Sequence, residues 1–432
     1  MKIFHITDHL PGYHKVWGGA EQAAYRIVKL LCRSKDIENW VITTNPTCSS
    51  MLTEDEKEFS NEDFRFHAIK SMEYYAGKRF EFLTSGFKNR GIPFDPVSFF
   101  SSYKLFRKTR PDLIHVHKAN LLSFSVIQSA ILLKIPVILS VYDYWYFCPA
   151  VSLVKGDGRL CDEFHGVQCI GCDALKDWKI LTKVLLFFRW KKLFDYYYSN
   201  INAFIVLSES SANILKSYGI NEKKIYVIHQ VFPLKDWEAS SVYDIEDNSI
   251  LFAGWVDEKK GLHILIDAMP EILKKVPDAK LYVLELTSYK EYKNKILKKI
   301  DEYGLKNKVF MLGRLSPDEF KGYLKKANIV VVPEQWKNMS PVIIAEAMAK
   351  AKPIVASRIG SIPEFIEHGI SGFLAEYNNP KDFAEKIIRI LQDKNKAIEM
   401  GKKARQMALD IFDEKKAEIK LMELYKMVSR EA

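Results

Sequence analysis

The alternation of short apolar runs with amphipathic helical segments is the feature that most restricts the fold of this chain. In the second half the apolar runs read SILFAGWV, KLYVLEL, KVFMLGRL, NIVVVPE and PIVAS. In the first half KIFHIT, NWVITT, PDLIHVH, IPVILSVY and AFIVLS have the same character, with GGAEQAAYRIVKLL and LLSFSVIQSAILL as helices between them. Apolar strands separated by amphipathic helices are typical of parallel sheets that helices cover on both faces. The sequence therefore predicts an α/β fold with two doubly wound sheets.

A polar, aperiodic stretch, DWEASSVYDIEDN at residues 236–248, separates the two strand-rich halves. We therefore expect one domain over residues 1–240 and another over residues 241–432, with the last helix packing back on the first domain. Ligands of doubly wound sheets bind beyond the carboxyl ends of the strands, so two such domains that face each other create a cleft.

The charge balance favours anionic partners. Lysine and arginine number 64 against 54 aspartate and glutamate, which gives a net charge of +10. This excess of positive charge favours phosphates and acidic lipid headgroups equally. We expect no nucleic-acid partner. The longest apolar stretches, such as Leu121 to Leu133, fall short of the roughly 20 residues that cross a bilayer. The opening MKIFHIT reads as a strand and not as a signal peptide, so we expect a cytoplasmic protein.

The segment PEQWKNMSPVIIAEAMAKAKPIVASRIGSIPE, residues 333–364, is the most informative for a site. Ser340 and Pro341 predict a helix that begins just beyond the strand NIVVVPE, because serine is a good N-cap and proline suits the first helical turn. The free N–H groups of that helix start can receive a phosphate. Glu346 is the only charge in PVIIAEAMA and needs a partner, either the two hydroxyls of a sugar diol or Lys350 at i+4.

Lys260 and Gly261 lie at a strand-to-helix junction in LFAGWVDEKKGLHILIDAM. A lysine beside a helix N-terminus suits a diphosphate leaving group, since both supply positive charge without a metal. An ordinary surface lysine is the commoner alternative.

The first half offers two weaker signals. Gly18 and Gly19 precede a helix, where the backbone can approach an anion closely. His115 and His117 share one face of the strand PDLIHVH, near the expected ligand side, either as catalytic or as core histidines.

Together, GGAE, PDLIHVH, VYDYWYFCP, the KG of Lys260 and Gly261, and EAMAKAKPIVAS with GSIPE resemble family-four glycosyltransferases. These retaining enzymes have the fold called GT-B, in which two Rossmann-like domains face each other across a cleft. The resemblance covers nearly the whole chain. It implies metal-independent transfer of a sugar from a nucleotide diphosphate donor, held mainly by the second domain, to an acceptor held by the first. It assigns the donor ribose hydroxyls to Glu346, the diphosphate to Lys260 and the backbone around Ser340 and Val342, and the donor's phosphate or sugar edge to Gly18 and Gly19.

Two departures from the family pattern concern the sugar and the acceptor. The second of the family's paired glutamates is Glu346, but the first, eight positions earlier, is Asn338, whose amide bonds hydroxyls without supplying a negative charge. The histidine common after the fourth strand is Tyr142, beside Asp143. We expect Asn338, Asp143 and His117 to orient the sugar and the acceptor, and Glu346 to orient the nucleotide.

A third departure concerns the diphosphate. The arginine usual five residues before the phosphate lysine Lys260 is Trp255, and Arg314 at the end of another strand is a substitute for it. These changes leave two alternatives to the transferase. One is a weak or inactive homologue that binds sugar nucleotides within a complex, and the other is an isomerase such as a sugar-nucleotide 2-epimerase.

Four cysteines follow the spacing C-x12-C-x7-C-x2-C: Cys148, Cys161, Cys169 and Cys172. Four thiolates could complete a tetrahedral zinc site or hold an iron–sulfur cluster. Reduced thiols packed as small hydrophobic groups are the alternative. We expect any such metal to be structural and to lie in an insertion over residues 148–195 of the first domain.

The insertion continues with LKDWKILTKVLLFFRWKKLFDYYY, in which basic residues interleave with aromatic ones. This pattern is typical of a helix on an anionic membrane surface, or of a helix that packs one face on the first domain. On the membrane interpretation the acceptor is a lipid-linked saccharide and the protein is peripheral at the inner membrane face; otherwise the acceptor is a glycan.

Overall fold

The structure is a computed structural model, and it describes residues 1–14, 18–45, 64–72, 74–75, 93–155, 159–161, 167–172, 175, 183, 191–239 and 244–430. The chain divides into two compact units, and each is described by itself. The first comprises Met1–Val231 with Glu414–Ala432, and the second comprises Phe232–Asp413. The expected boundary at residue 240 lies a short distance beyond the structural one.

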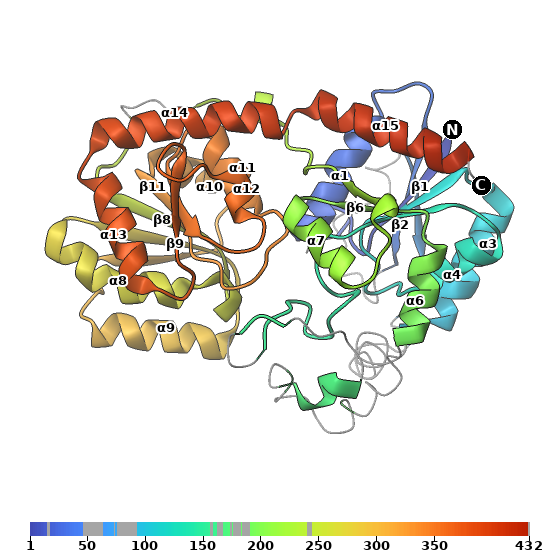
Figure 1. Cartoon of the computed structure of the whole chain (residues 1–432), viewed down its shortest axis with the longest axis horizontal. Coiled ribbons are helices and arrows are strands. Elements are labelled where there is room, and N and C mark those ends of the chain that lie inside the picture. Colours follow the sequence, from blue (N-terminus) through green and yellow to red (C-terminus); the bar gives the residue numbers. More distant parts are fainter. Residues whose placement is uncertain are drawn as a thin grey trace. The chain divides into compact units, whose positions relative to one another are not determined.

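The first unit is built on a parallel sheet with the strand order β3-β2-β1-β4-β5-β6-β7. Its strands are β1 (Lys2–Ile6), β2 (Glu38–Thr44), β3 (Arg65–Ile69), β4 (Leu113–Val116), β5 (Val137–Ser140), β6 (Ala203–Val206) and β7 (Ile225–Val227). Its helices are α1 (Gly19–Leu31), α3 (Pro96–Thr109), α4 (Ser125–Leu132), α6 (Lys191–Asn200), α7 (Glu209–Ser217) and α15 (Glu414–Arg430). Figure 1 shows these helices on both sides of the sheet, as the sequence predicts.

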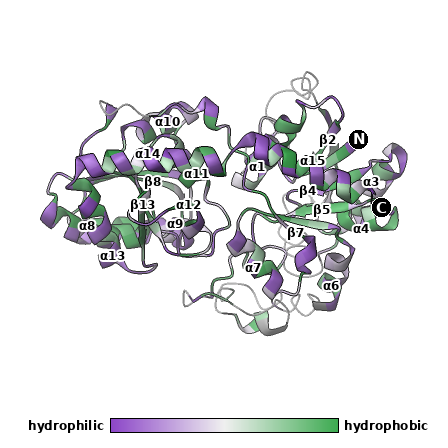
Figure 2. Ribbon diagram, turned by 45° about the horizontal axis from the view of Figure 1, so that its top comes forward, coloured by the Kyte–Doolittle hydropathy of each residue, from purple (hydrophilic) through white to green (hydrophobic). Residues whose placement is uncertain are grey.

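The second unit has a parallel sheet with the order β10-β9-β8-β11-β12-β13. Its strands are β8 (Ser249–Val256), β9 (Lys280–Ser288), β10 (Val309–Gly313), β11 (Ile329–Val332), β12 (Ile354–Ser357) and β13 (Gly372–Ala375). Its helices are α8 (Leu262–Lys275), α9 (Lys290–Glu302), α10 (Pro317–Lys326), α11 (Val342–Ala349), α12 (Ile362–Phe365), α13 (Pro380–Leu391) and α14 (Lys394–Ile411). Helices such as α8 and α13 carry both purple and green residues in Figure 2, as amphipathic helices do.

Both sheets reverse their strand order at one point, between β1 and β4 in the first unit and between β8 and β11 in the second. At such a point the loops that leave the two neighbouring strands diverge to opposite faces of the sheet. The carboxyl ends of these strands therefore border a crevice, where doubly wound proteins bind their ligands. This geometry singles out the segments that follow β1, β4, β8 and β11.

The last helix, α15, completes the core of the first unit although it follows the whole second unit in sequence. Leu421, Leu424 and Val428 of α15 are buried together with Ile3 of β1 and Leu31 of α1. Figure 1 shows α15 running beside α1. The described helices are all too short or too polar to cross a membrane.

Three short strands of the structure are not predicted from the apolar runs of the sequence. The first, β3, lies at the sheet edge and has only one buried residue, Ile69, after four exposed or half-buried ones. The second, β7, lies at the other edge and has three half-buried residues. The third, β13, begins with Gly372, where a Cβ would approach the carbonyl oxygen of Ile354 to 2.4 Å. Edge exposure and a glycine start both weaken the apolar run by which a strand is recognised.

Candidate functional site

Three loops at the carboxyl ends of β8, β11 and β12 meet in the second unit, and two glycines let them touch. Gly261 has a φ of 71°, and a Cβ there would lie 1.8 Å from the carbonyl oxygen of Pro333. Gly360 has a φ of 55°, and its Cβ would lie 2.8 Å from Cα of Lys337. Only glycine accepts this backbone conformation and this closeness together. The loops after β8 and β12 are therefore both pressed against the segment that follows β11.

The predicted phosphate lysine, Lys260, is anchored where these loops meet. Its backbone N–H donates to the Asp257 carboxylate at 2.9 Å, within the 3-10 turn Glu258–Lys260. Its ammonium Nζ donates to Oε1 of Glu334 at 2.6 Å and lies 5.6 Å from the centre of the Trp336 ring. Asn338 Nδ2 also donates to Glu334 Oε1, at 3.0 Å. The structure thus joins Lys260 and Asn338 through a carboxylate that the sequence analysis missed.

A simple signal would have pointed to Glu334. It is an acidic residue that directly follows the apolar strand β11 and Pro333, at the carboxyl end of the sheet. Charged residues at that end of a buried strand tend to serve the ligand site.

The helix α11 begins slightly later than predicted. Pro341, and not Ser340, is the N-cap residue, no side chain caps the helix, and Val342 is its first residue. Ser340 stays in the loop because its N–H donates to the Asn338 side-chain oxygen at 3.1 Å. Asn338 therefore forms a turn that comes directly before the first residues of α11.

Glu346 lies on α11 and is half-buried. Lys350, the partner considered from spacing, donates its Nζ to the carbonyl of Glu238 at 2.9 Å and lies 5.7 Å from the centre of the Trp237 ring. Lys350 thus extends toward residues 237 and 238.

Two further donor-side candidates, Trp255 and Arg314, lie at the ends of β8 and β10. Trp255 lies in β8, is 41% exposed, and has its ring 6.4 Å from that of Tyr289. Arg314 is exposed and follows β10, which β9 separates from β8 in the sheet. The strand before Arg314 is therefore not adjacent to the strand before Lys260.

In the first unit, the helix start at Gly18 and Gly19 is occupied by a carboxylate of the chain itself. Gly18 is the N-cap of α1, and its N–H donates to Glu21 Oε2 at 3.0 Å. The other oxygen, Oε1, lies 3.1 Å from Lys118 Nζ, just beyond β4. Burial alone would raise the pKa of Glu21, but hydrogen bonding to His9 and the charge of Lys118 lower it to about 2. The buried Glu21 therefore links the ends of β1, β4 and α1.

Two further acids fix loops at this end of the first sheet. The Asp8 carboxylate, after β1, accepts hydrogen bonds from the N–H groups of Asn120 at 2.7 Å and Leu121 at 3.0 Å. The Asp143 carboxylate, after β5, accepts one from Trp145 N at 2.9 Å.

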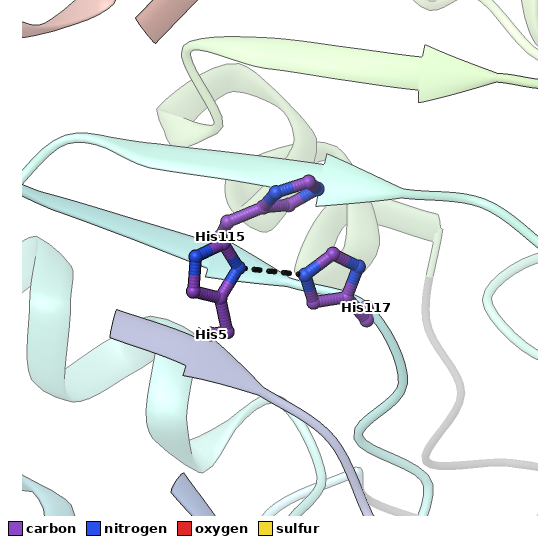
Figure 3. Close-up of side chains that lie close together, drawn as sticks. All are labelled: His5, His115 and His117. Carbon is purple, nitrogen blue, oxygen red and sulfur yellow. Dashed lines mark hydrogen bonds between the residues drawn. The ribbon is translucent and has the colours of Figure 1, made fainter. Parts of the chain in front are cut away.

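His117, a candidate for orienting the acceptor, belongs to a buried cluster with His5 and His115 (Figure 3). Nδ1 of His5 and Nε2 of His117 are 3.0 Å apart, and Nδ1 of His117 is 3.3 Å from the Tyr142 hydroxyl. His115 reaches the Tyr425 hydroxyl of α15 at 2.6 Å. Burial lowers the pKa of His5 to about 4 and holds those of His115 and His117 well below the usual range.

The partners of these rings fix their tautomers. His5 Nε2 lies 3.0 Å from the side-chain oxygen of Asn39 and must donate to it, so the Nδ1 of a neutral His5 is an acceptor. His117 Nε2 then donates to His5, and His117 Nδ1 accepts from Tyr142. The lone pairs of His5 and His117 that could bind a metal are thus used in hydrogen bonds. These hydrogen bonds run from Asn39 through His5 and His117 to Tyr142, and Tyr142 is half-buried.

The structure does not bring three of the four cysteine sulfurs within 4.8 Å of one another, and a metal held by these cysteines stays a prediction. Among described residues, the three histidines are the only group of His, Cys, Asp or Glu side chains whose ligand atoms come within 4.8 Å of one another. Most of the basic and aromatic segment that follows the cysteines, residues 176–182 and 184–190, lies outside the described residues.

Comparison with known proteins identifies the family. The model for Glycosyltransferase Family 4 matches residues 17–234, and the model for Glycosyl transferases group 1 matches residues 235–407. The chain belongs to glycosyltransferase family 4. It is a glycosyltransferase, as the resemblance of its motifs implies.

Among curated relatives, the glycosyltransferase is 31% identical over 170 residues to the lipopolysaccharide 1,2-N-acetylglucosaminetransferase of Salmonella typhimurium, covering 38% of this chain and 44% of that protein. It is 28% identical over 180 residues to spore coat protein SA of Bacillus subtilis, covering 41% of this chain and 48% of that protein. These matches span less than half of either relative.

Solved structures show the fold of the glycosyltransferase over its whole length. Sucrose-phosphate synthase from Thermosynechococcus elongatus superposes with a TM-score of 0.72 at 16% identity, covering 100% of both chains. Anabaena HepE in complex with UDP superposes with a TM-score of 0.70 at 16% identity, covering 99% of this chain and 100% of that one. The predicted GT-B fold, with two Rossmann-like units, is confirmed.

Proposed function

We propose that this glycosyltransferase moves a sugar, with retention of configuration, from a nucleoside diphosphate sugar to a glycan or lipid-linked saccharide. The second unit, approximating the predicted domain 241–432, binds the donor, and the first unit binds the acceptor.

The observation that carries the donor part is the joining of Lys260 to the loop that leads into α11. The Lys260 ammonium, through Glu334 and Asn338, is connected to the turn at Ser340. An ammonium and a helix start on one hydrogen-bonded loop suit a diphosphate, since both stabilise negative charge. Glu346, half-buried one turn into α11, orients the donor by accepting hydrogen bonds from the ribose hydroxyls.

In this proposal the bond between the anomeric carbon and the diphosphate breaks while a bond to an acceptor hydroxyl forms. Negative charge grows on the departing diphosphate, where Lys260 and the backbone around Pro341 and Val342 act on it. No metal is needed to supply that positive charge. Asn338 orients the sugar, with Trp255 and Arg314 at the edges of the donor site.

The acceptor part of the proposal uses the ends of the first sheet. Gly18 and Gly19 approach the phosphate or sugar edge of the donor, Asp143 binds the acceptor, and His117 orients it through Tyr142. A lipid-linked acceptor at an anionic membrane surface suits the net charge of +10 and the basic, aromatic segment.

The names of similar proteins guide the choice of donor. Structures of Anabaena HepE hold UDP, UDP with glucose, and UDP-glucose. The Salmonella relative is named as a transferase of N-acetylglucosamine. Uridine diphosphate sugars are therefore the first donors to test.

A thermal-shift screen with UDP-glucose, UDP-N-acetylglucosamine, GDP-mannose and ADP-glucose tests the donor assignment, because a ligand of the folded state raises its melting temperature. We expect at least one donor to stabilise the protein. Glu346→Ala should weaken its binding by roughly 10- to 100-fold, the cost of losing hydrogen bonds to a charged group.

The control is Glu399→Ala, which removes an exposed carboxylate from α14 and should leave donor binding unchanged. Equal donor affinity of the Glu346→Ala protein and the wild type would contradict the role of Glu346. With a saccharide acceptor, NMR of the product should show the anomeric configuration of the donor; inversion would refute the retaining mechanism.

A further inference from the structure

Glu334 is the most enclosed charged group of the second unit's site. Only 1% of its surface is exposed, yet three side chains donate to its carboxylate. Lys260 Nζ at 2.6 Å and Asn338 Nδ2 at 3.0 Å share Oε1, and the indole N–H of Trp336 binds Oε2. A buried carboxyl group is costly unless it is hydrogen-bonded, and the three donors supply those hydrogen bonds to Glu334.

The acid replaces a charge that is missing nearby. Position 338, where the family motif has its first glutamate, holds an asparagine. Its Nδ2 faces Glu334, and its Oδ1 accepts from Ser340 N at 3.1 Å. The carboxylate absent from residue 338 is therefore present one hydrogen bond away, on residue 334.

The same carboxylate controls the direction of the Lys260 ammonium. An ammonium has three N–H donors on a flexible stem, and holding it in one position costs side-chain entropy. The 2.6 Å bond to Glu334 and the Trp336 ring on one side fix that position. The close approach of Gly261 to Pro333 holds the two loops in register, so the ion pair is not an incidental surface contact.

We infer that Glu334 is a positioning residue that supplies the carboxylate Asn338 lacks and aims Lys260 at the donor diphosphate. This inference rests on the proposed function and deepens its donor site. Glu334 need not touch the donor; it acts through Lys260 and Asn338.

An exchange of the acid and the amide tests the inference. In Glu334→Gln one oxygen still accepts, but the new NH2 group faces the N–H of Trp336 or the ammonium of Lys260, so one donor loses its acceptor. In the double variant Glu334→Gln/Asn338→Asp, the NH2 group at position 334 takes the place of Oε1 and donates to the new carboxylate at position 338, while the amide oxygen accepts from Trp336. One oxygen of the new carboxylate still accepts from Ser340 N, and the other can accept from the Lys260 ammonium, which has lost Oε1 as its acceptor. The site then again contains one carboxylate and one amide.

The measurements are the rate of nucleoside diphosphate release from each donor of the thermal-shift screen, with its kcat and KM, and the melting temperature of each variant. We expect Glu334→Gln to lower kcat by on the order of 10²-fold, the effect of a misplaced catalytic group. The KM should change by less than about 3-fold, because the aim of Lys260 matters mainly for charge that develops in the transition state. The double variant should recover most of kcat.

Asn338→Asp alone places two carboxylates within hydrogen-bonding distance of each other, and should also lower kcat, through like-charge repulsion. If Glu334→Gln melts below the assay temperature, Asn338→Asp tests the positioning role of Glu334 in its place. The matched control is Asp267→Asn, which removes a carboxylate bonded to Lys299 at 2.6 Å between α8 and α9, and should retain wild-type kcat.

Wild-type kcat in folded Glu334→Gln, or in Asn338→Asp, would overturn the inference while leaving the proposed function intact. A double variant no better than Glu334→Gln would also overturn it, since a purely structural role requires the acid at its own position. If the wild type neither binds nor cleaves any of the donors, the proposed function fails and the inference fails with it.

Discussion

At the scale of the residue, the polar groups at the carboxyl ends of both sheets are bonded to one another before any ligand arrives. Glu21 binds Lys118 in the first unit, and Glu334 binds Lys260 in the second. Each pair joins the ends of elements that flank the reversal of strand order. The charges are thus held in place by the fold, which lowers the cost of ordering them on ligand binding.

The buried histidines predict that stability falls with acidity in a defined range. The pKa of His5 is about 4 in the folded protein and 6.5 in the unfolded chain, so the unfolded chain binds the extra proton between these values. Stability is fully present above about pH 6.5 and is lost as the pH falls toward 4, by roughly 3 kcal/mol from His5 alone. Urea unfolding at several pH values measures this slope.

The variant His5→Asn lacks the imidazole that takes up a proton on unfolding. The free energy of unfolding should therefore change less steeply with pH between pH 6.5 and 4 in this variant. Glu21 provides a separate check. Its pKa is lowered to about 2, so its contribution is present above about pH 4.5 and is lost only at lower pH. Unfolding free energies that do not change between about pH 7 and pH 4.5 would show that the histidines are not held neutral by burial.

Residue patterns predict some members of the site and not others. Lys260 and Glu346 stand out because a lysine precedes a helix start and an acid interrupts an apolar run. Glu334 and His5 do not stand out, because their importance comes from partners far away in sequence. Lys260 and Glu334 are 74 residues apart, and His5 and His117 are 112 residues apart. Local spacing carries no information about such pairs.

At the scale of the element, the loop after β8 depends on a glycine that does two things at once. Gly261 adopts a positive φ at the end of the 3-10 turn, and its missing Cβ admits the carbonyl of Pro333. The start of α8 can thereby lie directly on the segment that carries Glu334. Strand and helix positions are predictable from periodicity and from local signals such as the capping box of Ser316 and Glu319 at the start of α10. The contact between two loops is not.

Replacing this glycine should separate the loops. Gly261→Ala should lower the free energy of unfolding by about 2–4 kcal/mol, from the left-handed backbone and from the overlap with Pro333. Donor binding should weaken as well, because Lys260 moves with its turn. Urea unfolding and calorimetric titration with the donor measure the two effects.

Gly322 within α10 is the matched control, since nothing lies within 4 Å of a Cβ built there. Gly322→Ala should be neutral or stabilise the protein by up to about 1 kcal/mol, the usual gain of alanine over glycine in a helix. If the two alanine variants unfold alike, close approach at Gly261 is not what the loop requires.

At the scale of the whole molecule, the two α/β units are predictable from the alternation of strands and helices, but the path of the chain is less so. The first unit takes α15 from beyond the second unit, and α15 buries Leu421 among residues of β1, β4 and α1. The unit on which the last helix packs cannot be predicted from the residues of this helix alone. Its amphipathic pattern shows only that it packs on something.

A cavity in α15 should therefore weaken the first unit and not the second. Leu421 is fully buried, so Leu421→Ala should cost about 2–5 kcal/mol. Hydrogen exchange read by mass spectrometry should show faster exchange in β1 and β4 with little change in β8 and β11. Ile419 on the same helix is 57% exposed, and Ile419→Ala should leave exchange close to the wild type in both units. Faster exchange confined to the second unit would refute the assignment of α15.

The return of α15 also affects the order in which the protein matures during synthesis. A ribosome completes Phe232–Asp413 before it makes the helix that closes the core around Ile3 and Leu31. Nascent domains commonly fold from the amino end onward. Here the first unit cannot complete its core until the second unit has been translated, and the apolar residues that α15 covers stay exposed for that time.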